Sequence, residues 1–157
     1  MPEGARAHWL VMIDGAARGN PGPAGCGAWI RDPAGVVSKK LYRYLGTATN
    51  NVAEYEGLLM ALEEALSLGA RSVKINSDSE LLVKQINGEY RVRSEKLKEL
   101  HGKALGLLRR FERYRLTHIR REENRVADEL ANRAIDSGLA AEKRGLKPSY
   151  SKVQAIA

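Results

Sequence analysis

An aspartate at the end of a buried strand constrains this chain more than any other feature. Residues 9–13 form a short, contiguous apolar run rich in β-forming residues, which predicts a buried strand. Asp14 follows directly, and the glycine- and proline-rich stretch after it predicts a tight loop that reaches Gly27. A buried or half-buried carboxylate is costly unless another group pairs with it. The rest of the chain must therefore supply partners for Asp14.

Length and composition limit the classes of protein to which the chain can belong. The 157 residues are 43% hydrophobic and 29% charged, as expected for one soluble globular domain. No apolar run approaches the roughly 18 residues of a membrane span, and the N-terminus lacks the apolar centre of a secretory signal. Cys26 is the single cysteine, which excludes an internal disulfide framework and a cysteine-rich zinc site. We therefore expect a cytoplasmic protein, without membrane contact and monomeric.

The net charge of the chain is +7, and its pI is about 9.7. A basic domain commonly binds a polyanion, and nucleic acid is the leading candidate. A solvated basic surface without a partner is the alternative, and charge alone does not decide between the two.

The order of predicted elements indicates an α/β fold, a mixed sheet with helices on its faces. Strands are predicted at residues 9–14, 27–31, 36–45, 70–77 and 115–119, and helices at residues 52–68, 79–87, 94–111 and 124–138. The first three strands form an antiparallel meander, and the helix after them implies a parallel crossover. Gly138 is expected to end the last helix. We therefore divide the chain into a lead-in of residues 1–8, a main domain of residues 9–138 and a tail of residues 139–157.

The positions of a few acids set them apart from the other carboxylates. Asp14 and Asp78 each follow a predicted core strand, and ligand sites form where the carboxyl ends of neighbouring parallel strands meet. Glu54 and Asp128 lie near helix starts, each in a row with apolar residues that face the sheet. A helix-dipole or capping role is the alternative for Glu54 and Asp128 taken singly.

Taken together, these acids predict a metal site. Several carboxylates that converge on one edge cannot all ionise without a counter-charge, and bound cations usually supply it. All-oxygen ligands suit Mg²⁺ or Mn²⁺ and not zinc. His8, His101 and His118 show no metal-ligand spacing, and neither a nucleotide-binding glycine motif nor a Ser-His-Asp arrangement is evident.

Four blocks of the sequence resemble the type-one branch of the ribonuclease H family. They are IDGAARGNPGPAGCGAWI, TNNVAEYEGLLMALEEAL, INSDSELLVKQINGEY and REENRVADELANRA, in that order, and the resemblance covers residues 9–136. The acidic tetrad of the family falls on Asp14, Glu54, Asp78 and Asp128. The resemblance implies a five-stranded mixed sheet of order 3-2-1-4-5 flanked by helices, and it makes residues 9–138 the catalytic domain.

The activity implied by the resemblance is endonucleolytic hydrolysis of the RNA strand of RNA–DNA hybrids, which leaves 5′-phosphate and 3′-hydroxyl ends. It implies two Mg²⁺ ions roughly 4 Å apart, with Mn²⁺ as an alternative metal. Asp14 would bridge both ions, and Glu54 and Asp78 would complete the site on the leaving-group side. Asp128 would help to hold the ion that activates the attacking water.

The resemblance also implies contacts to nucleic acid, chiefly to the 2′-hydroxyl that separates RNA from DNA. The implied contact residues are Gly15, Asn20, Thr49, Asn50, Asn51 and Glu80, together with Glu54. Turn formation and helix capping are alternative roles for Asn50 and Asn51. We also expect the glycines after Asp14 to keep their loop free of side chains, so that the hybrid backbone can approach the metals.

The chain departs from the family pattern in the loop before the last acid. Many bacterial members carry a catalytic histidine there, whereas this chain has Arg121, Glu122 and Asn124 as auxiliary candidates, with His118 inside the predicted strand. The basic protrusion is also missing, because only residues 89–93 join two predicted helices. Ala17 stands where cysteine or serine is common. These departures indicate a compact form of the family, whose hybrid binding depends strongly on salt.

Two other functions remain open at the level of sequence. A nuclease of the same fold could act on double-stranded RNA, and a non-catalytic module could simply bind nucleic acid. A pure binder gains nothing from repelling acids at its phosphate-binding surface, so the tetrad favours an enzyme.

Overall fold

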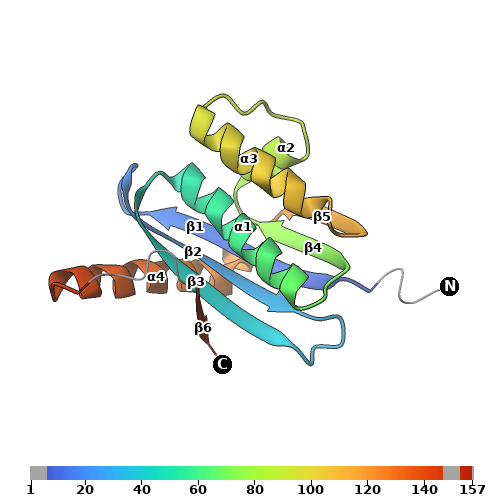
Figure 1. Ribbon diagram of the computed structural model, residues 1–157, viewed down its shortest axis with the longest axis horizontal. Coiled ribbons are helices and arrows are strands. Elements are labelled where there is room, and N and C mark those ends of the chain that lie inside the picture. The colour runs from blue at the N-terminus through green and yellow to red at the C-terminus, as the bar shows by residue number, and fades with distance from the viewer. Residues whose placement is uncertain (1–6, 147–152, 157) are drawn as a thin grey trace.

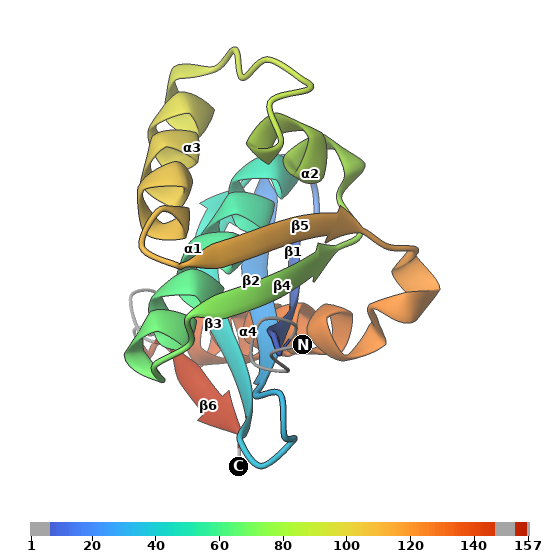
Figure 2. The same cartoon turned by 90° about the vertical axis from the view of Figure 1, so that its right-hand side faces the viewer.

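The computed structural model describes residues 7–146 and 153–156, which form one mixed sheet between two layers of helices. The strands are β1 (Trp9–Ala17), β2 (Gly22–Arg31), β3 (Ser38–Ala48), β4 (Ser72–Ser77), β5 (Arg113–His118) and β6 (Gln154–Ile156). The helices are α1 (Asn50–Ser67), α2 (Glu80–Ile86), α3 (Glu95–Leu108) and α4 (Arg125–Lys143), with a 3₁₀ turn at Arg121–Glu123. Figure 1 and Figure 2 show α1, α2 and α3 on one face of the sheet and α4 on the other.

The sheet has the order β5-β4-β1-β2-β3-β6. β1 pairs antiparallel with β2 and parallel with β4, so the inner order 3-2-1-4-5 is confirmed. The prediction of five strands is wrong, because β6 pairs antiparallel with β3 and places Ala155 opposite Leu41. A three-residue strand is too short to produce a hydrophobic period, and its position depends on the unpaired edge of β3.

The glycine-rich stretch after Asp14 is mostly strand, and the predicted loop up to Gly27 is wrong. β1 continues to Ala17 and β2 begins at Gly22, which leaves only residues 18–21 between them. A Cβ on Gly27 would lie 2.5 Å from the Cβ of Leu130 in α4. The glycines therefore let helices rest directly on the strands. The expectation that they also let the hybrid backbone approach the metals stays a prediction.

Gly138 lies inside α4, so its predicted role as the end of the last helix is wrong. A Cβ there would lie 2.2 Å from the ring of Tyr44, so this glycine marks a close contact between helix and sheet. The predicted boundary at residue 138 thus crosses a continuous helix, and the division into domain and tail stays a prediction. Residues 1–6 of the lead-in and residues 147–152 and 157 of the tail lie outside the described residues.

The hydrophobic core lies between the sheet and α1. Val11, Ile13 and Ile75 of the central strands pack with Leu58 and Leu62 of α1, all fully buried. α1 itself begins after Thr49, whose hydroxyl accepts the Val52 N–H. This core fixes α1 across the ends of β1 and β4. In the described part of the chain, no helix is long and apolar enough to cross a membrane.

We expect Gly27→Ala to destabilise the protein by about 1–3 kcal/mol, because the added methyl group must displace the backbone of α4. Gly102→Ala is the matched control, since nothing lies within 4 Å of a Cβ at that helical position. It should stabilise α3 by roughly 0.5–1 kcal/mol. Urea unfolding of both variants measures the difference, and a neutral Gly27→Ala would contradict the close contact of α4 with β2.

Candidate active site

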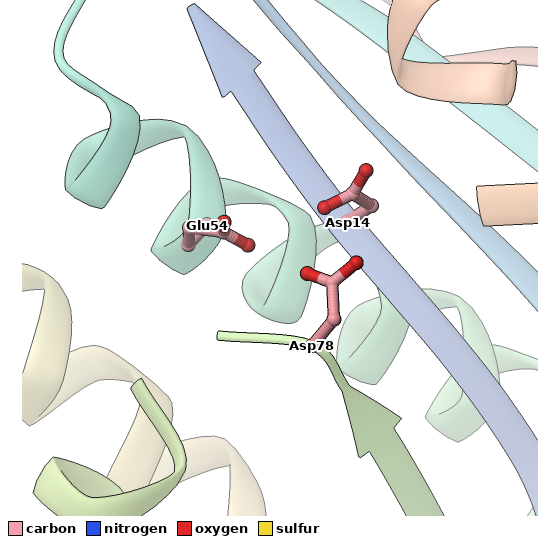
Figure 3. A group of neighbouring side chains, drawn as sticks. All are labelled: Asp14, Glu54 and Asp78. Carbon is pink, nitrogen blue, oxygen red and sulfur yellow. The ribbon is translucent and has the colours of Figure 1, made fainter. Parts of the chain in front are cut away.

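Three carboxylates from different elements meet at one edge of the sheet. Asp14 lies near the carboxyl end of β1, Asp78 follows β4, and Glu54 extends from α1 towards them (Figure 3). One oxygen from each lies within 4.8 Å of the others. The parallel pairing of β1 with β4 places Ile13 beside Ser77, which brings the next residue of each strand to the same edge. The predicted adjacency of the two aspartates is therefore present.

Glu54 is held in the cluster by its helix and does not cap that helix. Thr49 is the N-cap of α1, and Glu54 lies a full turn beyond it. Its Oε2 atom is buried and has no hydrogen-bond partner. An unpaired buried carboxylate oxygen is costly, so the cluster requires a ligand or a proton at this atom.

The turn that carries Asp78 is fixed by hydroxyl groups, a feature that sequence reasoning missed. Ser77 is fully buried, and its Oγ accepts the N–H of Ser79 at 3.0 Å. The Ser79 hydroxyl then accepts the Leu82 N–H at 3.1 Å and caps α2. The signal in the sequence is the pair of serines that flank Asp78.

Asp128 joins the site from the first turn of α4, beside Asp14. It lines a cavity of about 370 Å³ together with Asp14, Glu54 and Asp78, yet it is not among the three oxygens grouped within 4.8 Å. Its Oδ1 lies 4.0 Å from Arg121 Nη2 and 3.5 Å from Asn132 Nδ2. The fold thus gathers all the predicted acids into one cavity.

Burial and mutual repulsion dominate the electrostatics of the cluster. Burial, followed by the charges of Asp78 and Asp128, raises the pKa of Asp14 to about 8. Burial, followed by the charges of Asp14 and Asp78, raises the pKa of Glu54 well above its usual value. The site therefore resists full ionisation unless a positive charge enters it.

Some of the predicted nucleic-acid contacts lie at the cavity, and others do not. Gly15 and Asn50 line it. Asn50 Oδ1 accepts the Ala17 N–H at 2.9 Å, and Asn20 Oδ1 accepts the Asn50 N–H at 3.0 Å, so these amides tie the β1–β2 loop to α1. Thr49 is the N-cap of α1. Helix capping, the alternative role named for Asn50 and Asn51, is thus performed by the residue before them. Asn51 and Glu80 are exposed and do not line the cavity.

The auxiliary candidates differ in their positions. Arg121 lines the cavity, whereas Glu122 and His118 are exposed outside it. Asn124 is buried, and its Nδ2 donates to the Ile13 carbonyl at 2.8 Å. Asn124 therefore anchors the start of α4 to β1, one residue before Asp14.

Comparison with known proteins agrees with this geometry. A family model described as reverse transcriptase-like matches residues 12–134. The bifunctional protein Rv2228c of Mycobacterium tuberculosis is 41% identical over 130 residues, which are 82% of this chain and 35% of that protein. The chain therefore spans about a third of the length of this relative. Ribonuclease HI of Halobacterium salinarum is 38% identical over 133 residues, 85% of this chain and 66% of that protein.

The solved structures include LC11-RNase H1 in complex with an RNA/DNA hybrid. It is 41% identical in sequence and superimposes with a TM-score of 0.76. The match covers 83% of this chain and 99% of that chain. The sheet order, the gathered acids and these similarities lead to one conclusion. The chain belongs to the type-one branch of the ribonuclease H family.

Proposed function

We propose that this protein is an endonuclease that hydrolyses the RNA strand of RNA–DNA hybrids with the help of divalent cations. The convergence of Asp14, Glu54 and Asp78 at the sheet edge, with Asp128 in the same cavity, carries the proposal. A structural role does not account for these acids, because burial, followed by their mutual repulsion, raises the pKa of Asp14 and Glu54. The hybrid bound to LC11-RNase H1 supports the choice of substrate.

The residues present fit divalent cations with oxygen ligands. Carboxylate oxygens suit Mg²⁺ and Mn²⁺, and the unpaired Oε2 of Glu54 is a ligand atom without another partner. We propose that two Mg²⁺ ions are held by Asp14, Glu54, Asp78 and Asp128, with Asp14 shared between them. Bound cations of this kind lower the pKa of water and stabilise the charge that develops on a phosphate during hydrolysis.

The protein's own contribution is to hold these groups in fixed positions. Strand pairing and the Ser77–Ser79 turn hold Asp14 and Asp78 in place before any substrate arrives. Preorganised ligands avoid the reorganisation that would otherwise accompany the reaction. Arg121 lines the cavity with its side chain exposed and 4.0 Å from Asp128, so it is placed to contact an anionic phosphate.

Recognition of the RNA strand is assigned to the segment around Gly15, Asn20 and Asn50. Asn50 lines the acidic cavity, and its hydrogen bonds join it to both Asn20 and Ala17. A ribose 2′-hydroxyl both donates and accepts, so amide side chains at this position would favour RNA over DNA. The 5′-phosphate and 3′-hydroxyl product ends, the monomeric state and the cytoplasmic location stay predictions.

Asp128→Asn should lower kcat/KM for a labelled hybrid by more than about 100-fold, because it removes a charge from the reacting centre. Glu129→Gln is the matched control, since this neighbouring acid of α4 is exposed and does not line the cavity. The assay runs with Mg²⁺, Mn²⁺ or EDTA on hybrid, double-stranded RNA and double-stranded DNA. The proposal would be refuted if Asp128→Asn cleaved the hybrid at the normal rate. It would also be refuted if the wild type cleaved no hybrid with either Mg²⁺ or Mn²⁺.

At pH 8.5 in EDTA, Asp14→Asn should stabilise the folded protein by about 2 kcal/mol. In a chain of this size that raises the melting temperature by about 4 °C or more. The folded pKa of about 8 exceeds the ordinary value of 3.8, so the folded state holds an additional proton between these pH values. Wild-type stability therefore falls as pH rises through this window, and the gap between the two proteins should shrink towards pH 5. A gap that widened towards pH 5 would contradict the burial and repulsion assigned to Asp14.

A further inference from the structure

The face of the sheet that carries α4 is largely basic where the helix does not cover it. α4 packs on the glycines of β2, with Gly25 and Gly27 against its buried side. Further along the strands, the same face presents cations from β4 and β5 on one side of β1 and from β2 and β3 on the other. We call this surface the basic face, formed by Arg31, Lys40, Lys74, Arg113 and Arg115, with half-buried Leu10 and Met12 at its centre.

The strand register and printed contacts place these side chains on one face. Lys74 lies opposite Leu10 on β1 and opposite Arg115 on β5. Met12 Sδ lies 3.5 Å from Asn76 Nδ2, so the even-numbered residues of β1 and β4 point the same way. On β2, Trp29 has the Arg31 guanidinium 3.7 Å from its ring centroid and Lys40 Nζ at 5.3 Å.

The cations of the basic face lack the ion pairs that other basic residues of this protein form. Lys39 pairs with Glu64 and Arg43 with Glu56, both at 3.0 Å or less. None of the five cations of the basic face forms an ion pair with a carboxylate among residues 7–146 and 153–156.

The register adds an unfavourable interaction that a bound anion would relieve. Lys74 and Arg115 are directly opposite each other on adjacent strands, where like charges are destabilising. Beside them, a cavity of about 460 Å³ is lined by Ser72 and Arg113 as well as by this pair. Its basic groups are suitable donors to phosphate oxygens.

We propose that the basic face binds an unpaired nucleic-acid strand, at a second surface that shares no residue with the lining of the acidic cavity. Cations lie on both sides of Leu10 and Met12, so phosphates can contact the charges while a base contacts the apolar centre. The face spans about 19 Å from β5 to β3, taking roughly 4.8 Å for each strand spacing. The inference concerns binding alone and does not depend on hydrolysis by the acidic cluster.

The chemistry of the face favours a single strand over the other polyanions. A duplex keeps its bases stacked inside and would leave Leu10 and Met12 without a partner. An acidic peptide carries backbone N–H groups that need acceptors, which are usually supplied by a free strand edge. On this sheet β6 pairs with residues 40–42 at the outer edge of β3, and Asn87 Nδ2 donates to the Leu116 carbonyl on β5.

The test is fluorescence anisotropy with a labelled 20-nucleotide oligothymidylate, in EDTA and at a series of salt concentrations. The double variant Lys74→Gln, Arg115→Gln should bind about 20-fold more weakly at 0.1 M salt, and its log–log salt slope should fall by about 1.4. The control Lys143→Gln, Arg144→Gln removes the same charge from the exposed end of α4 and should bind within about twofold of wild type. Arg113→Gln alone should lower the slope by about 0.7.

Melting curves check that these variants are folded. Because Lys74→Gln, Arg115→Gln removes the repulsion between the two side chains, its melting temperature should be unchanged or higher. Equal binding by the two double variants would overturn the proposal, and so would a wild-type protein that does not bind oligothymidylate. A 20-residue polyaspartate that bound the wild type more tightly than oligothymidylate would assign the face to an acidic protein, and would equally overturn it.

Discussion

The parallel pairing of β1 with β4 is the interaction on which the rest of the structure depends. It sets Ile13 beside Ser77 and so brings Asp14, which is still in β1, next to Asp78, which follows the end of β4. α1 then adds Glu54, because Gly57 lets the helix approach β1 so closely that a Cβ there would lie 2.9 Å from the Asp14 carbonyl oxygen. The backbone thus holds repelling carboxylates at short range, and the core between α1 and the sheet supplies the stability that offsets their repulsion.

The same chain separates charges of opposite sign on its surface. A protein of net charge +7 concentrates acids in one cavity. On the open part of the sheet it presents cations that form no ion pair within the described part of the chain. An acidic cavity alone would repel a polyanion, so the surrounding basic charge is needed for nucleic acid to approach at all. Cations in the acidic cavity would remove the remaining local repulsion, which links metal binding to substrate binding in the proposed function.

The sequence predicted the features that depend on local pattern and on strand ends. The resemblance to the ribonuclease H family implied the order of the inner strands, and with it the adjacency of Asp14 and Asp78. The helix expected from residue 94 begins after Ser94, which caps α3. The errors concern glycines whose role is tertiary. Gly27 suggested a loop and Gly138 a helix end, yet both are places where α4 touches the sheet.

The missed parts of the site have the same origin. Ser77 and Asn124 can be singled out in the sequence, but what they contact cannot be predicted there, because their partners are backbone groups fixed by folding, such as the Ile13 carbonyl. β6 was missed because three residues carry no period. The charges of the basic face are visible in the sequence, but only the register reveals that Lys74 and Arg115 are opposite each other.

Calorimetric titration of Mn²⁺ into the wild type and into Asp14→Asn tests the central claim most directly, because it isolates the cation site from substrate binding and hydrolysis. The account predicts saturable binding to the wild type and a loss of at least about 10-fold in affinity when Asp14 is replaced, since a shared carboxylate ligand is removed. Binding of equal affinity to both proteins would contradict the assignment of the acidic cluster as the metal site.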